Sequence, residues 1–97
     1  MKRTKDYIEL LRKHKKEYAE NYGITRIGIF GSIARGEQTK ESDIDIYFEA
    51  DKISLFRMGG FMYDLQELLG VSVDLVHNTK NLKPYFRQRI EKDIIYV

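Results

Sequence analysis

Apolar residues recur at helical spacing in two long segments of the chain. Over residues 4–21 the pattern is formed by Tyr7, Ile8, Leu11 and Tyr18, with Lys15 at the same spacing. Over residues 54–69 it is formed by Leu55, Met58, Met62, Leu65 and Leu69. Because residues three and four apart share one face of a helix, both segments are predicted to be helical. Thr4 is a candidate N-cap, and Gly23 and Gly70 are suited to end the two helices.

Two adjacent glycines, Gly59 and Gly60, interrupt the second helical segment. Glycine inside a helix costs about 1 kcal/mol relative to alanine, so a pair of them needs a reason. We interpret the pair as a place where the helix packs closely on a sheet, or where it breaks into two shorter helices. The alternative is that the backbone here approaches a ligand or a partner.

Three other segments have the patterns of β-strands. Residues 25–30 are rich in Ile and Phe, and residues 71–76 place Val71, Val73 and Leu75 on one face. Residues 43–49 alternate strictly, with Ile44, Ile46 and Phe48 on one face and Asp43, Asp45, Tyr47 and Glu49 on the other. The middle strand should therefore have one face in the core and the other at a site.

A final helix and a short strand are expected in the last part of the sequence. Residues 77–80 predict a turn, after which Asn81 is a candidate N-cap for a helix through about Lys92, with Pro84 tolerated in its first turn. The core stripe of this helix comprises Leu82, Phe86 and Ile90, with Tyr85 and Arg89 alongside. Residues 93–97 are suited to a short edge strand.

The predicted elements alternate between helix and strand along the chain, which places the protein in the α/β class with helices packed on a small sheet. A parallel sheet is the default for such alternation. However, the polar residues 37–42 form only a short, exposed link between the one or two helical turns that residues 33–36 can make and the second strand, and so short a link also allows antiparallel neighbours. We therefore expect a mixed β-sheet.

Composition limits the class of protein further. The 97 residues predict one domain, 1–97, and the 42% apolar content can supply its core. The absence of cysteine excludes disulfides and thiolate metal sites. No apolar run approaches the ~20 residues of a membrane helix, and no apolar stretch of signal-peptide length follows the basic N-terminus. We expect a soluble cytoplasmic protein without membrane contact.

Charge is distributed unevenly along the chain although the net charge is only +2. Residues 1–16 carry seven Lys and Arg against two acids, a local balance of +5, while residues 37–51 carry six acids against one Lys. Such runs usually form a solvated face. The alternative is attraction of a polyanion such as a nucleotide or RNA, so direct binding of nucleic acid stays open.

A Gly-Ser turn follows the first predicted strand directly. After Gly31 and Ser32, residues 33–36 can form one or two helical turns whose first free N–H groups face outward at the strand end. Glycine allows close approach of the backbone to a phosphate, and the Ser32 hydroxyl can donate to its oxygens. Alone, this is a weak signal for a phosphate site.

Three aspartates supply the complementary chemistry. Asp43 and Asp45 share one face of a strand, and Asp74 joins them if the two strands are neighbours. Clustered carboxylates repel one another unless a cation is bound, and hard oxygen ligands suit Mg²⁺. The alternative is that Asp43 caps the start of its strand and Asp74 is tolerated at an edge. His77 is interpreted as a turn residue, with contact to a substrate as its alternative.

Together these motifs resemble a known family. The residues Gly31-Ser32-x-Ala34-Arg35-Gly36, Ser42-Asp43-Ile44-Asp45-Ile46 and Val73-Asp74-Leu75-Val76 are similar to those of the minimal nucleotidyltransferases of the DNA polymerase beta superfamily. The resemblance covers roughly residues 25–97, and it implies the polymerase beta-like nucleotidyltransferase fold.

The resemblance also implies roles for single residues. Gly31 and Ser32 would hold a nucleoside triphosphate, ATP in the relatives considered below. Asp43 and Asp45 would bind two Mg²⁺ ions, and Asp74 would complete one metal site and help activate the attacking hydroxyl. Many relatives carry Arg where this chain has Ile33, so that position receives no role. Arg35 and Ser42 match the family and are expected to fix the loop by hydrogen bonds.

Small members of this family resemble the antitoxins of prokaryotic HEPN/MNT toxin–antitoxin pairs. Those antitoxins transfer AMP from ATP to a tyrosine of the partner ribonuclease and silence it. The short chain offers no second domain for an acceptor, so we expect a HEPN-type toxin protein as partner, in a possible hetero-oligomer. The resemblance thus implies an Mg²⁺-dependent protein adenylyltransferase.

Two alternatives belong to other functional classes. One is a binding antitoxin that occludes a HEPN ribonuclease without catalysis. The other is the catalytic subunit of a small-molecule or RNA nucleotidyltransferase, whose acceptor site is built with another chain. The acceptor, the preferred base and the oligomeric state are not specified by the sequence.

Overall fold

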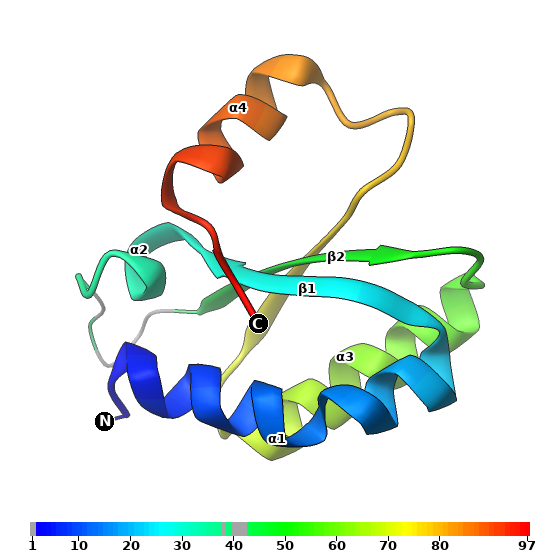
Figure 1. The fold of residues 1–97 in the computed structure, drawn as a ribbon, viewed down its shortest axis with the longest axis horizontal. Coiled ribbons are helices and arrows are strands. Elements are labelled where there is room, and N and C mark those ends of the chain that lie inside the picture. Colours follow the sequence, from blue (N-terminus) through cyan, green and yellow to red (C-terminus); the bar gives the residue numbers. More distant parts are fainter. Residues whose placement is uncertain (1, 38, 40–42) are drawn as a thin grey trace.

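The computed structural model describes residues 2–37, 39 and 43–97. Within them the helices are α1 (Thr4–Tyr22), α2 (Gly31–Ala34), α3 (Leu55–Leu69) and α4 (Pro84–Asp93) (Figure 1). The strands are β1 (Ile24–Phe30), β2 (Ile44–Ala50), β3 (Val73–His77) and β4 (Ile95–Tyr96). None of these described helices combines the length and the apolar character that crossing a membrane requires.

The strands form one mixed sheet, as the sequence predicts. Their order is β3-β2-β1-β4, with β1 antiparallel to both β2 and β4, and β2 parallel to β3. The short edge strand β4 is confirmed, and it pairs with the middle of β1 at Gly28 and Ile29. Between β1 and β2 the described residues contain only the four-residue helix α2, which is too short to cross the sheet as the helix of a parallel connection does, and the two strands pair in the antiparallel sense.

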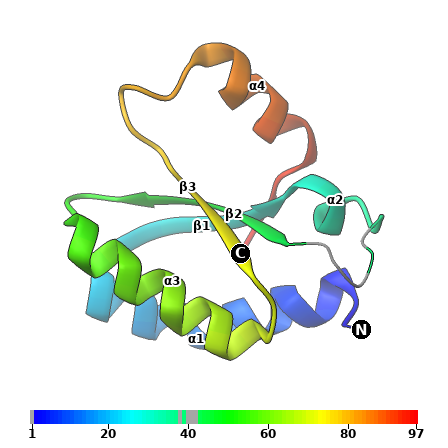
Figure 2. The same ribbon diagram turned by 180° about the vertical axis from the view of Figure 1, so that it is seen from behind.

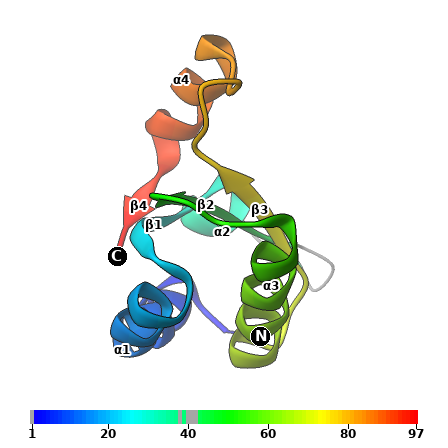
Figure 3. The ribbon, with the colours of Figure 1, turned by 90° about the vertical axis from the view of Figure 1, so that its right-hand side faces the viewer.

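The helices divide between the two faces of the sheet. In the end-on view of Figure 3, α1 and α3 pack side by side beneath the sheet and α4 lies above it. Figure 2 shows the same layers from behind, with the short helix α2 at the end of the sheet. The face covered by α1 and α3 thus contributes to the core, and the other face is only partly covered by α4.

An aromatic cluster centred on Phe61 joins α1, α3 and β2. The Phe61 ring centroid lies 5.4 Å from that of Tyr18, 5.3 Å from that of Tyr22 and 5.3 Å from that of Phe48. Two of these pairs meet edge to face, the favoured geometry for aromatic rings. The fully buried aliphatic residues around this cluster include Leu11, Ile27, Ile29, Ile44, Ile46, Leu65 and Leu69.

The start of α1 differs from the prediction. Thr4 is the first helical residue and Arg3 is the N-cap, so the assignment of Thr4 as N-cap is wrong. The backbone N–H of Arg3 donates to the Asp6 carboxylate at 2.9 Å, which satisfies one end group of the helix from within it. The Thr4 hydroxyl instead donates to the Ile33 carbonyl of α2 and links the two helices.

The start of α4 is also later than predicted. The helix begins at Pro84, because the fixed φ of proline suits the first helical position, and Asn81 lies three residues before it. Asn81 is therefore not the N-cap, and Leu82 lies outside the helix. Of the predicted core stripe only Ile90 is buried, while Phe86 is 38% exposed.

The glycines of α3 have no packing role on the sheet. The helix is unbroken, a Cβ at Gly59 would meet nothing within 4 Å, and one at Gly60 would meet the Tyr22 side chain of α1 at 3.5 Å. Both of our interpretations, close packing on the sheet and a break in the helix, are therefore wrong. The predicted ends at Gly23 and Gly70 are confirmed, with φ of 71° and 73°.

We predict that Gly59→Ala stabilises the protein by about 1 kcal/mol, because the methyl group enters open space and alanine favours the helix. This corresponds to a rise in Tm of roughly 4–8 °C for a domain of this size. Thermal and urea unfolding followed by circular dichroism measure the effect.

The contrasting variant is Gly28→Ala. A Cβ at Gly28 would lie 2.8 Å from the Ile94 side chain and 3.0 Å from the Ile95 carbonyl, so this variant should lose stability as β4 is displaced. A stability loss in Gly59→Ala would contradict the open environment of Gly59.

Candidate active site

The pairing of β1 with β2 brings the Gly-Ser turn against the first aspartates. Phe30, the last residue of β1, lies opposite Asp45, and the chain turns into α2 at Gly31. Gly31 has φ of 76°, and a Cβ on it would overlap Oδ2 of Asp45. Glycine is therefore required both for the backbone conformation and for the space that the carboxylate occupies.

The pairing of β2 with β3 adds the third aspartate. In this parallel register Asp45 lies directly opposite Asp74. Asp43 directly precedes the first residue of β2, and its charge acts on Asp45 two residues later. The predicted grouping of the three aspartates required β2 and β3 to be neighbours, and the structure confirms that they are.

The charges of Asp43 and Asp74 affect the pKa of Asp45. Asp45 is half-buried, and its pKa is raised mainly by burial, then by the charges of Asp74 and Asp43, while Arg35 acts in the opposite direction. Asp43 and Asp74 are exposed. A cation at this edge would relieve both the repulsion and the cost of keeping Asp45 ionised.

The donor set fits a hard divalent ion such as Mg²⁺, because all of its ligands would be carboxylate oxygens. As the side chains stand, however, the described residues contain no group of three His, Cys, Asp or Glu side chains arranged to hold a metal ion. The backbone thus brings Asp43, Asp45 and Asp74 to one edge of the sheet. Their closure around metal ions stays a prediction.

A cleft of about 360 Å³ opens beside Asp45, between the end of β1 and α4. Gly31, Ser32 and Asp45 line one side, and Phe86 and Arg89 of α4 line the other. A volume of this size lies in the range of small-molecule sites. Sequence reasoning missed the contribution of α4, since it assigned Phe86 to the core and gave Arg89 no role.

Arg35 lines this cleft and links the segment after α2 to the end of α4. Its guanidinium donates to Glu37 at 3.0 Å and to Asp93, at the end of α4, at 2.6 Å. These contacts confirm that Arg35 holds the first residue of the predicted loop by a hydrogen bond. Ser42, the other residue expected to fix the loop, lies outside the described residues, as do positions 38 and 40–41.

His77 does not belong to the site. It is the last residue of β3 rather than part of a turn, and its ring stacks on Phe48 with centroids 4.6 Å apart and planes 3° apart. Since Phe48 is fully buried, His77 faces the core side of the sheet, opposite to Asp74. Both interpretations of His77, as turn residue and as substrate contact, are therefore wrong.

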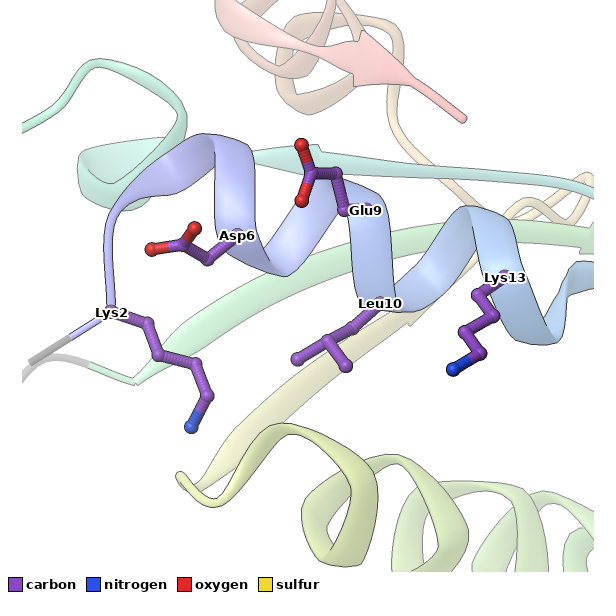
Figure 4. A pocket seen from close by; sticks show the side chains of 5 residues that line it. All are labelled: Lys2, Asp6, Glu9, Leu10 and Lys13. Atoms are coloured by element: carbon purple, nitrogen blue, oxygen red, sulfur yellow. The ribbon is translucent and has the colours of Figure 1, made fainter.

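A second cleft of about 370 Å³ lies along α1, away from the aspartates (Figure 4). Its lining residues are Lys2, Asp6, Glu9, Leu10 and Lys13. Figure 4 shows Lys2 reaching toward the end of α3, where its ammonium donates to the Leu69 carbonyl at 3.4 Å. Asp6 is held by the backbone N–H of Arg3. These contacts anchor the start of α1, and the candidate chemistry lies at the other cleft.

Comparison with known proteins gives a consistent result. The nucleotidyltransferase domain family matches residues 11–97. A proposed protein adenylyltransferase of Methanocaldococcus jannaschii is 44% identical over 98 residues, covering 100% of both chains. The protein adenylyltransferase MntA of Thermococcus cleftensis is 38% identical, covering 97% of this chain and 96% of the relative.

Two solved structures have the same fold. A proposed minimal nucleotidyltransferase superimposes with a TM-score of 0.81 and 27% identity, covering 97% of this chain and 95% of the other. The crystal structure of a toxin–antitoxin with AMP-PNP superimposes with a TM-score of 0.69 and 25% identity, covering 96% and 70%.

We predict that Asp45→Asn raises the stability of the metal-free protein at neutral pH. A carboxyl whose pKa is raised by folding destabilises the fold above its unfolded pKa of about 4, and this penalty disappears below that pH. The gain should therefore be present at about pH 7 and absent below about pH 4. Thermal melts across this range measure it.

Mg²⁺ should raise the Tm of the wild type and have less effect on Asp45→Asn, with a stabilisation of about 2.7 kcal/mol at a hundred times the Kd. Asp51→Asn, at an exposed position beyond β2, is the control and should respond to Mg²⁺ like the wild type. A wild-type Tm that is indifferent to Mg²⁺ would contradict a metal site at this edge.

Proposed function

Because the chain belongs to the nucleotidyltransferase domain family, we propose that it transfers AMP from ATP to a hydroxyl group of a partner toxin protein and so acts as an antitoxin. The acceptor hydroxyl in this proposal is that of a tyrosine. The observation that carries the proposal is the position of Asp45, which lies against Gly31 on one side and opposite Asp74 on the other.

The residues of the site divide the work of this reaction. Gly31 and Ser32, which line the cleft, would contact the triphosphate. Asp43 and Asp45 would hold two Mg²⁺ ions, with Asp74 completing one of the two sites. Bound Mg²⁺ supplies charge neutralisation at the phosphates and at the attacking and leaving oxygens.

The bond changes are those of an in-line displacement at phosphorus. The acceptor oxygen forms a bond to the α-phosphorus of ATP. The bond between that phosphorus and the oxygen that bridges the α- and β-phosphorus breaks. Pyrophosphate leaves, and the acceptor proton passes to Asp74 or to a water that Asp74 orients. Because Asp74 is exposed, an acceptor from another molecule can reach it.

Two kinds of relative support a protein acceptor. The relatives from M. jannaschii and T. cleftensis carry the name protein adenylyltransferase, and one structural neighbour is a toxin–antitoxin with AMP-PNP. The resemblance to HEPN/MNT pairs makes a HEPN-type ribonuclease the expected partner. We place the reaction in the cytoplasm, where such a ribonuclease would meet its RNA.

The direct test combines the protein with ATP, Mg²⁺ and the toxin encoded beside it. Mass spectrometry should find the toxin heavier by one or more AMP groups on tyrosine. Asp43→Ala and Asp45→Asn should slow transfer by roughly 10²–10³-fold, the range for loss of one charge-stabilising group. Asp51→Asn should transfer at the wild-type rate.

Each alternative function has its own outcome in this test. Full neutralisation of the toxin by Asp45→Asn and Asp74→Asn would assign the activity to binding alone. Transfer to RNA or to small hydroxyl compounds, without any protein acceptor, would identify the protein as the catalytic subunit of a small-molecule or RNA nucleotidyltransferase. An unmodified toxin with the wild type, or undiminished transfer by Asp43→Ala, would overturn the proposal.

A further inference from the structure

We propose that α4 forms the second half of the nucleotide site, with Arg89 contacting the phosphates and Phe86 stacking on the base. This inference rests on the proposed function, since it assigns residues to the same nucleotide. Phe86 and Arg89 are three residues apart and therefore neighbours on one face of the helix. Both line the cleft whose other wall contains Gly31, Ser32 and Asp45.

The charge balance of the site favours a cation from α4. The carboxylates of Asp43, Asp45 and Asp74 lie at one edge of the sheet, and a nucleoside triphosphate brings about four further negative charges. Metal ions offset only part of this charge. Basic side chains that line the cleft are suited to offset part of the remainder.

Two arginines of the described residues line this cleft, and they differ in how they are engaged. Arg35 is held by Glu37 at 3.0 Å and by Asp93 at 2.6 Å, so its charge is already compensated. Arg89 is exposed and forms no ion pair within the part of the chain that the structure describes. Its planar guanidinium suits bidentate contact with phosphate oxygens.

Phe86 presents an apolar ring at the same cleft. It was predicted to be core, yet it is 38% exposed, so folding leaves part of its ring for a ligand to cover. A flat ring stacks on the face of any base, which adds affinity without selecting the base. Phosphates near Ser32 and a base near Phe86 would place the nucleotide along the cleft between the sheet and α4.

Helix α4 is held in position at its C-terminal end. Asp93, the last residue of α4, accepts from Arg35, and β4 directly after it pairs with β1. The Arg26 guanidinium lies 3.6 Å from the ring centroid of Tyr96 in β4 and adds a cation–π contact to this pairing. Side chains carried by α4 are thus positioned before a ligand arrives, as a binding site requires.

The test separates the two contacts by using two probes, AMP-PNP with Mg²⁺ and inorganic tripolyphosphate with Mg²⁺, in titration calorimetry. Arg89→Gln should raise the Kd of both probes by roughly 10–100-fold, as expected for loss of a hydrogen bond between charged groups. Phe86→Ala should raise the Kd of AMP-PNP about tenfold and leave that of tripolyphosphate unchanged.

Matched controls come from the same helix. Arg87→Gln removes an equal charge and Tyr85→Ala removes an exposed aromatic ring, and neither residue lines the cleft. Both should bind both probes like the wild type. An equal loss in Arg87→Gln and Arg89→Gln would overturn the assigned contact in favour of a general charge effect.

The outcomes also separate this inference from the proposed function. Unchanged binding of both probes by Arg89→Gln and Phe86→Ala, with binding by the wild type intact, would overturn the role of α4 alone. Failure of the wild type to bind AMP-PNP would overturn the proposed function as well. Melting temperatures close to that of the wild type verify that each variant is folded, as expected because Tyr85, Phe86 and Arg89 are exposed and Arg87 is only partly buried.

Discussion

The antiparallel register of β1 against β2 is the constraint on which both the core and the candidate site depend. It sets Ile29 against Ile46 in the core and, one step further, Phe30 against Asp45 at the edge. A slip of one residue would turn the buried face of β2 outward and carry the aspartates into the core. The hydrophobic alternation of β2 therefore fixes the position of the chemistry, because the core tolerates only one register.

Stability and chemistry are divided between the two faces of the sheet. Beneath it, the rings around Phe61 join α1, α3 and β2 into one buried layer. Above it, α4 covers the sheet only partly and leaves a cleft lined by charged, polar and apolar groups. This division lets half-buried Asp45 bear a raised pKa at the site while the opposite face supplies the free energy of folding.

Local patterns predicted the elements well, and tertiary contacts decided the rest. The alternation in β2 correctly placed Asp45 on the face opposite Ile44 and Ile46, but whether Asp74 joined it depended on strand order, which no local pattern contains. Phe86 has the same spacing in a core stripe as in a cleft wall, so only the docked position of α4 separates the two. The incorrect caps have local causes, because cap-forming residue types also occur near helix ends whose positions Asp6 and Pro84 determine.

The shortness of β4 affects how readily α4 opens and exposes the cleft to solvent. Two residues pair with β1 at Gly28 and Ile29, and the N–H of Val97 adds a hydrogen bond to the Ile27 carbonyl at 2.9 Å. Loss of these bonds, of the Arg35–Asp93 ion pair and of the packing of buried Ile90 would release α4 while the layer of α1 and α3 stays intact, so α4 can open without global unfolding. Amide hydrogens of α4 should accordingly exchange through local opening, and those of β1 and β2 through global unfolding. The helix that encloses the cleft is then held by contacts that can be lost while the rest of the sheet stays folded.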